Sequence, residues 1–193
     1  MTDHKIIDNF FPSDAFKKLH DFLLPQLTDI EKGRKHLEWY YLPGVTGNYY
    51  MPDSEYANKI KSELSDEDMK EDWRLFYLQH MVYAHTIVSP QLYKEIMPYC
   101  SKLLDIKALI RIKINMFPNT ETLREHGMHI DYDYPHKAGL FSINTCDGYT
   151  KLEDGTKIDS VANRVVLFDG STPHTSTTTT NQPVRVNINF NYF

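Results

Sequence analysis

The chain has 193 residues and a mass of 22.6 kDa, which is the size of one domain. Hydrophobic residues make up 41% and aromatic residues 13%, enough for a core, and this composition excludes a disordered chain. The 21 Lys and Arg stand against 26 Asp and Glu, and no basic stripe is visible, so we do not expect a nucleic-acid-binding protein.

Cysteine usage and the N-terminal segment favour a cytoplasmic protein. Cys100 and Cys146 are too few for a disulfide framework, and they form no Cys-x-x-Cys motif. The first ten residues, MTDHKIIDNF, carry charges where a signal peptide needs an apolar stretch. No run approaches the roughly 18 apolar residues that cross a bilayer, so we expect no membrane association.

Residues 1–106 are expected to form helices with irregular connections. Apolar residues at helical spacing predict a helix that starts at Ser13 or Asp14 and stops at Pro25. The same spacing predicts a helix over 91–104, with Pro98 kinking or shortening it. The other expected elements are an extended or hairpin segment over 39–52, a short helix over 54–64, a solvated acidic run over 65–72 and a strand over 73–88.

From residue 107 onward, short β-rich runs alternate with Gly, Pro, Asn and Asp turns. Such spacing is typical of a sandwich or barrel of antiparallel sheet. The chain is therefore expected to be a single mainly β domain with N-terminal helices, in which 1–106 support a core formed by 107–193. The predicted strands cover 108–117, 126–132, 138–145, 149–153, 156–160, 164–168, 173–179 and 184–192.

Two of these strands alternate strictly between apolar and polar side chains. Residues 110–117 place Arg111, Lys113 and Asn115 on one face, and residues 184–191 do the same with an arginine and three asparagines. One interpretation is a sheet with its polar face in water. The other places the polar face inside a jelly roll, where a buried Arg needs an anionic partner. The alternation alone leaves both open.

A His-x-Asp motif and a later histidine have the composition of a metal site. His129 and Asp131 are two residues apart, so on a strand both point to one face and can reach one ion. His174 follows 45 residues later, at the start of another predicted strand. Two imidazoles and one carboxylate are the ligands of non-haem Fe(II) oxygenases, and they leave positions open on the metal.

The order of motifs over residues 111–193 resembles that of the 2-oxoglutarate/Fe(II)-dependent dioxygenases, especially the small prolyl-4-hydroxylase-like branch of bacteria and phages. The motifs that carry the resemblance are RIKINMFP (111–118), HID (129–131), FSINTCDGYT (141–150), NRVVLFDGSTPH (163–174) and RVNINF (185–190). The resemblance implies a double-stranded β-helix, which is a jelly roll with helices packed on its major sheet. It also implies a bacterial cell or a phage-infected host as the setting.

The resemblance implies a role for individual residues. His129, Asp131 and His174 would be the iron ligands, and Arg185 would hold the distal carboxylate of 2-oxoglutarate. Further candidates for contacts with the cosubstrate are Ser142, Asn115 and Asn187.

Two positions depart from the pattern of that branch, and two other histidines are given no metal role. Phe117 stands where related enzymes often carry Tyr, and 147–150 replaces the first glycine of a Gly-Gly-x-Thr turn, a segment we interpret as structural. His126 is expected to be a loop or substrate contact rather than a ligand. His136 is expected to be exposed.

The implied activity is hydroxylation of a C–H bond, with O₂ and 2-oxoglutarate consumed and succinate and CO₂ released. The cofactor would be Fe(II), with ascorbate as a possible support. The substrate would be a prolyl or other side chain of a peptide or protein, or a small molecule. Two alternatives stay open: a nucleic-acid demethylase of the AlkB type, and a non-catalytic jelly-roll binding module. The sequence does not define the oligomeric state.

Overall fold

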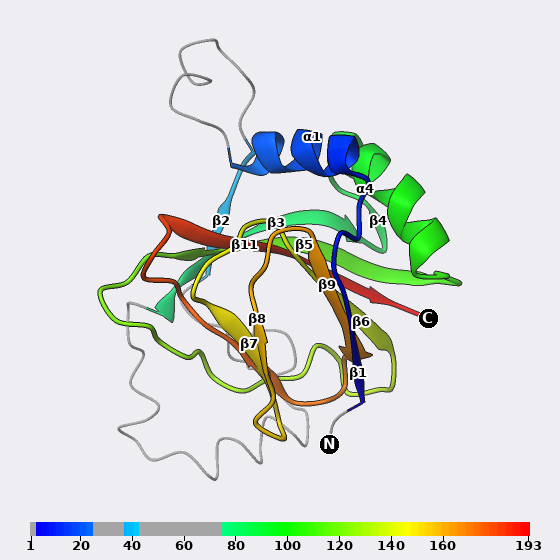
Figure 1. The fold of residues 1–193 in the computed structure, drawn as a ribbon. Helices are drawn as coiled ribbons and strands as arrows, with labels where there is room; N and C mark the ends of the chain where they lie inside the picture. Colours follow the sequence, from blue (N-terminus) through cyan, green and yellow to red (C-terminus); the bar gives the residue numbers. More distant parts are fainter. Residues whose placement is uncertain (1–2, 25–36, 43–74) are drawn as a thin grey trace.

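A computed structural model describes residues 3–24, 37–42 and 75–193 (Figure 1). The predicted elements at 54–64 and 65–72, and most of 39–52, lie outside the described residues. The helices are α1 (Ser13–Leu23) and α4 (Pro90–Leu103). The strands are β1 (His4–Ile7), β2 (Tyr40–Leu42), β3 (Tyr77–Ala84), β4 (Thr86–Ile87), β5 (Leu109–Pro118), β6 (Lys137–Ser142), β7 (Tyr149–Leu152), β8 (Lys157–Asp159), β9 (Arg164–Asp169), β10 (His174–Ser176) and β11 (Val184–Tyr192).

The strands form a large and a small antiparallel sheet that face each other. The large sheet has the order β1-β9-β6-β11-β5-β3-β2, with β4 paired to β3, and the small sheet has the order β10-β7-β8. Figure 1 shows both helices over the outer face of the large sheet and β7 and β8 across its inner face. The predicted mainly β jelly roll with helices on its major sheet is thus confirmed.

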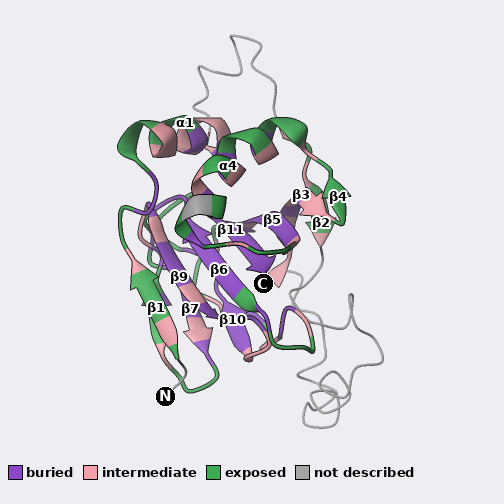
Figure 2. Cartoon of the chain, turned by 90° about the vertical axis from the view of Figure 1, so that its right-hand side faces the viewer, coloured by how far each residue is buried: buried purple, intermediate pink, exposed green. Residues whose placement is uncertain are grey.

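The main hydrophobic core lies between the two helices and the outer face of the large sheet. Leu19 and Leu23 of α1 and Leu92 and Ile96 of α4 pack in one cluster with apolar residues of the central strands. Those strand residues are Ile112, Ile114, Phe141, Val165, Val186, Ile188 and Phe190. The central strands of the large sheet are therefore buried, as the colouring of Figure 2 shows. Because side chains alternate along a strand, the residues between these apolar positions point to the inner face.

The inner face of β5 and β11 carries four rungs of paired side chains. Antiparallel pairing sets Arg111 opposite Asn191, Lys113 opposite Asn189, Asn115 opposite Asn187 and Phe117 opposite Arg185. All eight residues are buried. The interpretation that places the polar face inside the jelly roll is therefore correct, and the one that places it in water is wrong.

Three segments differ from the prediction. Residues 126–132 form no strand, because their backbone meets β10 at one isolated bridge, His129 to His174, and at one further hydrogen bond, from His126 to Ser176. The predicted strand at 73–88 divides into β3 and β4 at His85, whose φ is 58°. Strand β1 was not predicted, and it completes the edge of the sheet by pairing with β9.

No helix in the part of the chain that the structure describes is long and apolar enough to span a bilayer.

Candidate metal centre

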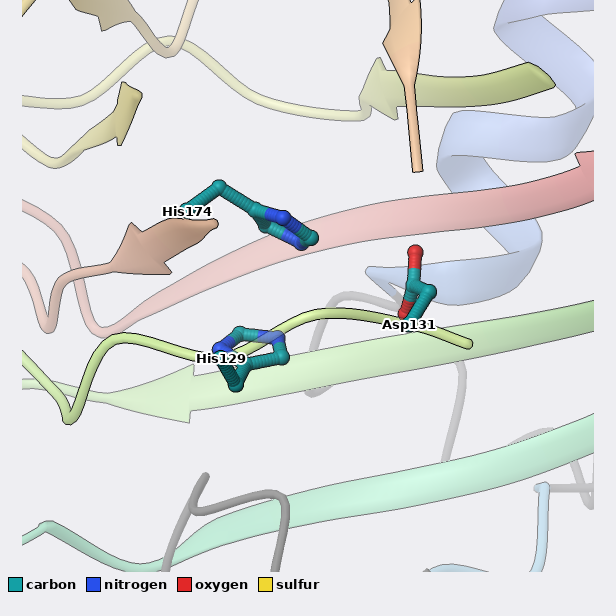
Figure 3. A group of neighbouring side chains, drawn as sticks. All are labelled: His129, Asp131 and His174. Carbon is teal, nitrogen blue, oxygen red and sulfur yellow. The ribbon is translucent and has the colours of Figure 1, made fainter. Parts of the chain in front are cut away.

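The side chains of His129, Asp131 and His174 converge on one point inside the jelly roll. One potential ligand atom from each residue lies within 4.8 Å of the others. Figure 3 shows the segment that carries His129 and Asp131 running past the start of β10, which carries His174. The two segments are fixed by reciprocal backbone hydrogen bonds between His129 and His174, at 2.9 and 2.8 Å. The sequence predicted this convergence, although it assumed a strand at 129–131.

Backbone carbonyl groups orient both imidazole rings. The Nδ1–H of His174 donates to the carbonyl oxygen of Thr172 at 2.9 Å, and the Nδ1–H of His129 faces that of Gly127 at 3.4 Å. A ring that donates through Nδ1 carries its lone pair on Nε2, which is the form in which histidine binds a metal. Both rings therefore present an available donor atom.

The protonation states suit a cation. Burial lowers the pKa of His129 well below 6.5, and the neighbouring His174 lowers it further. Burial likewise lowers the pKa of His174. For Asp131, burial raises the pKa, but the surrounding positive charge, first that of Arg111, outweighs burial and holds the pKa well below 3.8. Two neutral imidazoles and one carboxylate are the forms that ligate a metal.

The Asp131 carboxylate is held by three donors from the inner face of β5 and β11. Arg111 Nη2 donates to Oδ1 at 2.6 Å, and the amides of Asn189 and Asn191 donate to Oδ2 at 3.0 and 2.9 Å. An ionised carboxylate accepts at about four sites, so one stays available for a metal. The sequence motifs did not assign these three donors to the site, although the alternation of polar residues along β5 and β11 was their visible signal.

The expectation that His136 is exposed is wrong. His136 is 5% exposed, its Nδ1–H donates to the carbonyl oxygen of Tyr134, and its Nε2 accepts from the amide of Asn191 at 3.1 Å. A Cβ atom on Gly170 would lie 2.1 Å from His136 Nε2, so glycine is required beside this ring. The loop that follows Asp131 brings His136 to Asn191, which also donates to Asp131. The charges and the proline of this loop do not indicate such burial in the sequence.

A pocket opens beside the three converging side chains. His129 and His174 form part of its wall, together with the apolar side chains of Tyr77, Phe117 and Leu140. The polar part of the wall includes Lys113, Asn115, Thr150, Thr175, Ser176, Asn187 and Asn189.

Two of the three predicted cosubstrate contacts line this pocket. Asn115 donates through Nδ2 to Asn187 Oδ1 at 2.9 Å, and the Oδ1 of Asn115 has no partner among the described residues. Ser142 sits opposite Asn187 in the register, but it does not line the pocket. The position of Ser142 therefore supports a cosubstrate contact less well than those of the two asparagines.

Arg185 is a buried guanidinium that has no ion-pair partner among the described residues. It is 1% exposed, donates to the carbonyl oxygen of Thr177 and to the hydroxyl of Thr150, and stacks on Phe117 at 5.4 Å. Its Nε has no partner in the described chain. Burial lowers the pKa of Arg185 to about 10, as expected for a buried guanidinium with no ion-pair partner in the part of the chain that the structure describes. Arg185 does not itself line the pocket, but Thr150, to which it donates, does.

The segment at 147–150 shapes the space around Arg185. A Cβ atom on Gly148 would lie 2.6 Å from Arg185 Cδ and 2.7 Å from the carbonyl oxygen of Thr178, so a side chain there requires the arginine to move. Asp147 accepts from the hydroxyl of Thr179 and the backbone N–H of Thr180, which fixes the turn. The structural interpretation of this segment fits these contacts.

His126 lies apart from the converging three. It is 5% exposed, its Nδ1 faces the hydroxyl of Ser176 at 2.9 Å, and its ring packs on Phe117 at 5.0 Å. Burial lowers the pKa of His126 to about 4, so the ring is neutral at pH 7. These contacts fit a packing role.

Comparison with known proteins finds similarity in structure but none in sequence. No family model matches the chain, and no curated protein matches it in sequence.

Three solved structures illustrate the match in fold. The chain aligns over its full length with 84% of a prolyl hydroxylase from Trichoplax adhaerens in complex with a hypoxia-inducible-factor peptide, at 16% identity and a TM-score of 0.59. The full length of the chain also aligns with 93% of a Pseudomonas putida prolyl-4-hydroxylase, at 11% identity and a TM-score of 0.53. The third is a 2OG-Fe(II) oxygenase family protein from Burkholderia pseudomallei. The alignment covers 98% of this chain and 84% of that protein, at 9% identity and a TM-score of 0.58. The chain thus has the fold of the 2-oxoglutarate/Fe(II) oxygenases, including bacterial prolyl hydroxylases.

Proposed function

We propose that this protein is a 2-oxoglutarate- and O₂-dependent Fe(II) oxygenase that hydroxylates a C–H bond. The observation that carries the proposal is the group of His129, Asp131 and His174, whose ligand atoms lie within 4.8 Å of one another in a fold shared with such oxygenases. The donor set and the available Nε2 atoms fit Fe(II), because imidazole and carboxylate ligands suit that ion and leave coordination positions open.

The three residues would hold the metal, and the donors behind them would fix its geometry. Arg111, Asn189 and Asn191 keep Asp131 ionised and pointed at the site, and the carbonyl of Thr172 keeps His174 in the form that binds a metal. Bound iron supplies the oxidising chemistry with O₂ and 2-oxoglutarate, whose products are succinate and CO₂.

Arg185 would bind the distal carboxylate of 2-oxoglutarate. A guanidinium matches a carboxylate in shape and charge, and this one is buried with no ion-pair partner in the described chain. Asn115 and Asn187 lie on the rung between Arg185 and the metal residues, where their amides can contact the same molecule. Ser142 pairs with Asn187 across β6 and β11, so it would support the cosubstrate contact of Asn187 from the neighbouring strand.

The pocket walls would keep water away from the reacting atoms. Tyr77 stacks on Phe117 at 5.6 Å, and both rings line the pocket with Leu140. Phe117 occupies the place where a tyrosine hydroxyl would otherwise contact the cosubstrate, so recognition would depend on the arginine and the two asparagines. The apolar part of the wall would limit the access of water to the oxidant and so reduce side reactions.

The substrate would be a side chain of a peptide or protein, and a small molecule is the second possibility. Support comes from the fold match to a prolyl hydroxylase solved with a peptide. The whole chain would act as one domain in the cytoplasm, with residues 107–193 carrying the proposed metal ligands and cosubstrate contacts. Ascorbate would support activity by keeping the iron reduced.

The proposal is tested by succinate release and by the effect of Arg185→Met. With Fe(II), ascorbate and 2-oxoglutarate, the purified protein should release succinate slowly even without substrate. Loss of charge-assisted hydrogen bonds worth about 1.5–3 kcal/mol should weaken 2-oxoglutarate binding by about 10–100-fold in Arg185→Met, with metal binding retained. No succinate from the intact protein would contradict the proposed function. Loss of both metal and cosubstrate binding would instead assign Arg185 a folding role.

A further inference from the structure

A second buried cation, Lys113, lies in the wall of the pocket beside the metal residues. It sits on the inner face of β5, opposite Asn189, and lines the same pocket as His129 and His174. The residue is 7% exposed, so its ammonium is largely removed from bulk water. Burying a lone ammonium is costly, and burial lowers the pKa of Lys113 to about 7. An anion bound beside this side chain would therefore stabilise its charged form.

No anion of the described chain pairs with Lys113. Within residues 3–24, 37–42 and 75–193, its ammonium makes neither a hydrogen bond nor an ion pair. The carboxylate that acts electrostatically on Lys113 is Asp131, which is already bound by Arg111 at 2.6 Å and by two asparagine amides. The negative charge of Asp131 is thus matched by the arginine, and no ion pair holds the Lys113 side chain among the described residues.

The cosubstrate already has a cation elsewhere. Arg185 lies on the same face as Lys113 but two rungs farther along the strands. Four residues of strand separate the two rungs, which places their backbones roughly 13 Å apart. Arg185 is therefore placed for the far end of 2-oxoglutarate, whereas Lys113 shares its rung with Asn189, a direct donor to Asp131. The two cations serve different positions, one distant from the metal residues and one beside them.

We infer that Lys113 binds a carboxylate of the substrate, next to the carbon that is oxidised. This inference rests on the proposed function and narrows the substrate class to molecules with an anionic group near the reacting C–H bond. Examples of that chemistry are an acidic side chain of a peptide or a free amino-acid carboxylate. A prolyl side chain in a neutral peptide would leave Lys113 without its partner.

Binding of propionate and propionamide tests the inference, because the two differ in charge and hardly in shape. Each is titrated by ligand-observed NMR into protein loaded with Zn(II), which is redox-inert, and with 2-oxoglutarate. The wild type should bind propionate about tenfold more tightly than propionamide, the value of one charge-assisted hydrogen bond. In Lys113→Met, which keeps the length of the side chain, the preference should vanish. Lys113→Gln provides a second, polar replacement, and the exposed Lys94→Met is the matched control.

The 2-oxoglutarate affinity of the same proteins separates the outcomes. Equal cosubstrate binding in wild type and Lys113→Met, with the propionate preference lost only in the Lys113 variants, supports the inference. No preference in the wild type overturns it, and so does a preference that persists in both variants. Weaker 2-oxoglutarate binding in Lys113→Met overturns it as well, because the lysine would then serve the cosubstrate. Failure of the wild type to bind 2-oxoglutarate at all refutes the proposed function, and the inference falls with it.

Discussion

Arg111 and Asp131 form an ion pair that is shielded from water: Nη2 lies 2.6 Å from Oδ1, and the two side chains are 6% and 1% exposed. The pair joins a central strand of the large sheet to the irregular segment that carries two of the three proposed ligands. Stability of the fold and geometry of the site thus depend on the same contact.

Arg111→Met should therefore weaken metal binding and destabilise the metal-free protein. Loss of a donor behind a ligand typically lowers metal affinity by about 10–100-fold. Leaving Asp131 buried and unpaired should cost about 3–5 kcal/mol of unfolding free energy. Zn(II) titration and urea unfolding measure the two effects. Lys17→Met, which breaks an exposed pair with Asp21, is the control and should leave metal affinity unchanged. Wild-type metal affinity in Arg111→Met would contradict the role given to this pair.

Gly148→Ala should impair binding of 2-oxoglutarate without affecting the metal. The added methyl group would meet Arg185 Cδ at 2.6 Å and the backbone of Thr178, and so displace the guanidinium. Calorimetric titration of 2-oxoglutarate into Zn(II)-loaded protein should show an affinity loss comparable to that of Arg185→Met.

Gly155→Ala is the matched control for Gly148→Ala. Gly155 has a φ of 86° and nothing within 4 Å of an added Cβ atom, so alanine there costs about 1 kcal/mol of backbone strain but alters no contact with Arg185. The two variants should therefore differ in cosubstrate affinity: Gly155→Ala should lose stability but keep its affinity for 2-oxoglutarate, whereas Gly148→Ala should lose that affinity. Unchanged 2-oxoglutarate binding in Gly148→Ala would argue against Arg185 as the cosubstrate anchor.

His126 should make the protein less stable in mild acid. Its pKa is about 4 in the folded chain because of burial, against 6.5 as the ordinary value, so the unfolded chain binds the proton first as pH falls. The stability that this neutral ring contributes is present above pH 6.5 and is lost between pH 6.5 and 4, about 3 kcal/mol in all.

Urea unfolding of metal-free protein at pH 7.5 and 5 measures this effect. The difference in unfolding free energy between the two pH values should be smaller in His126→Gln than in wild type by about 2 kcal/mol. Since His129 and His174 titrate in both proteins, their contributions cancel in the comparison. Identical pH dependence in the two proteins would show that His126 titrates normally in the folded chain.

Local periodicity predicted much of the fold, whereas the His-x-Asp motif and the resemblance to a known family predicted the three converging residues. Apolar residues recur at every second position in β5 and β11 and at helical spacing in α1 and α4. Such periods follow from packing one face of each element against the core, so they can be recognised in the sequence. The order of the motifs then placed His129, Asp131 and His174 together.

The features that were missed depend on contacts between distant segments. Strand β1 pairs with β9 across more than 150 residues, and a four-residue run has no periodicity to reveal it. His136 is buried because its loop brings the ring against Gly170 and within hydrogen-bonding distance of Asn191. Arg111 and Lys113 look alike in sequence, and only the structure shows that Arg111 pairs with Asp131 whereas Lys113 has no ion-pair partner among the described residues.

An anaerobic titration of the Fe(II)-loaded protein with 2-oxoglutarate tests the central claim most directly. Bidentate binding of the cosubstrate to iron held by two histidines and one carboxylate should produce a weak visible charge-transfer band that saturates at one 2-oxoglutarate per chain. The band should be absent in His174→Ala and present in His126→Gln, a buried histidine outside the group of three. A folded wild-type protein that gives no band, or a His174→Ala variant that gives the full band, would contradict the account.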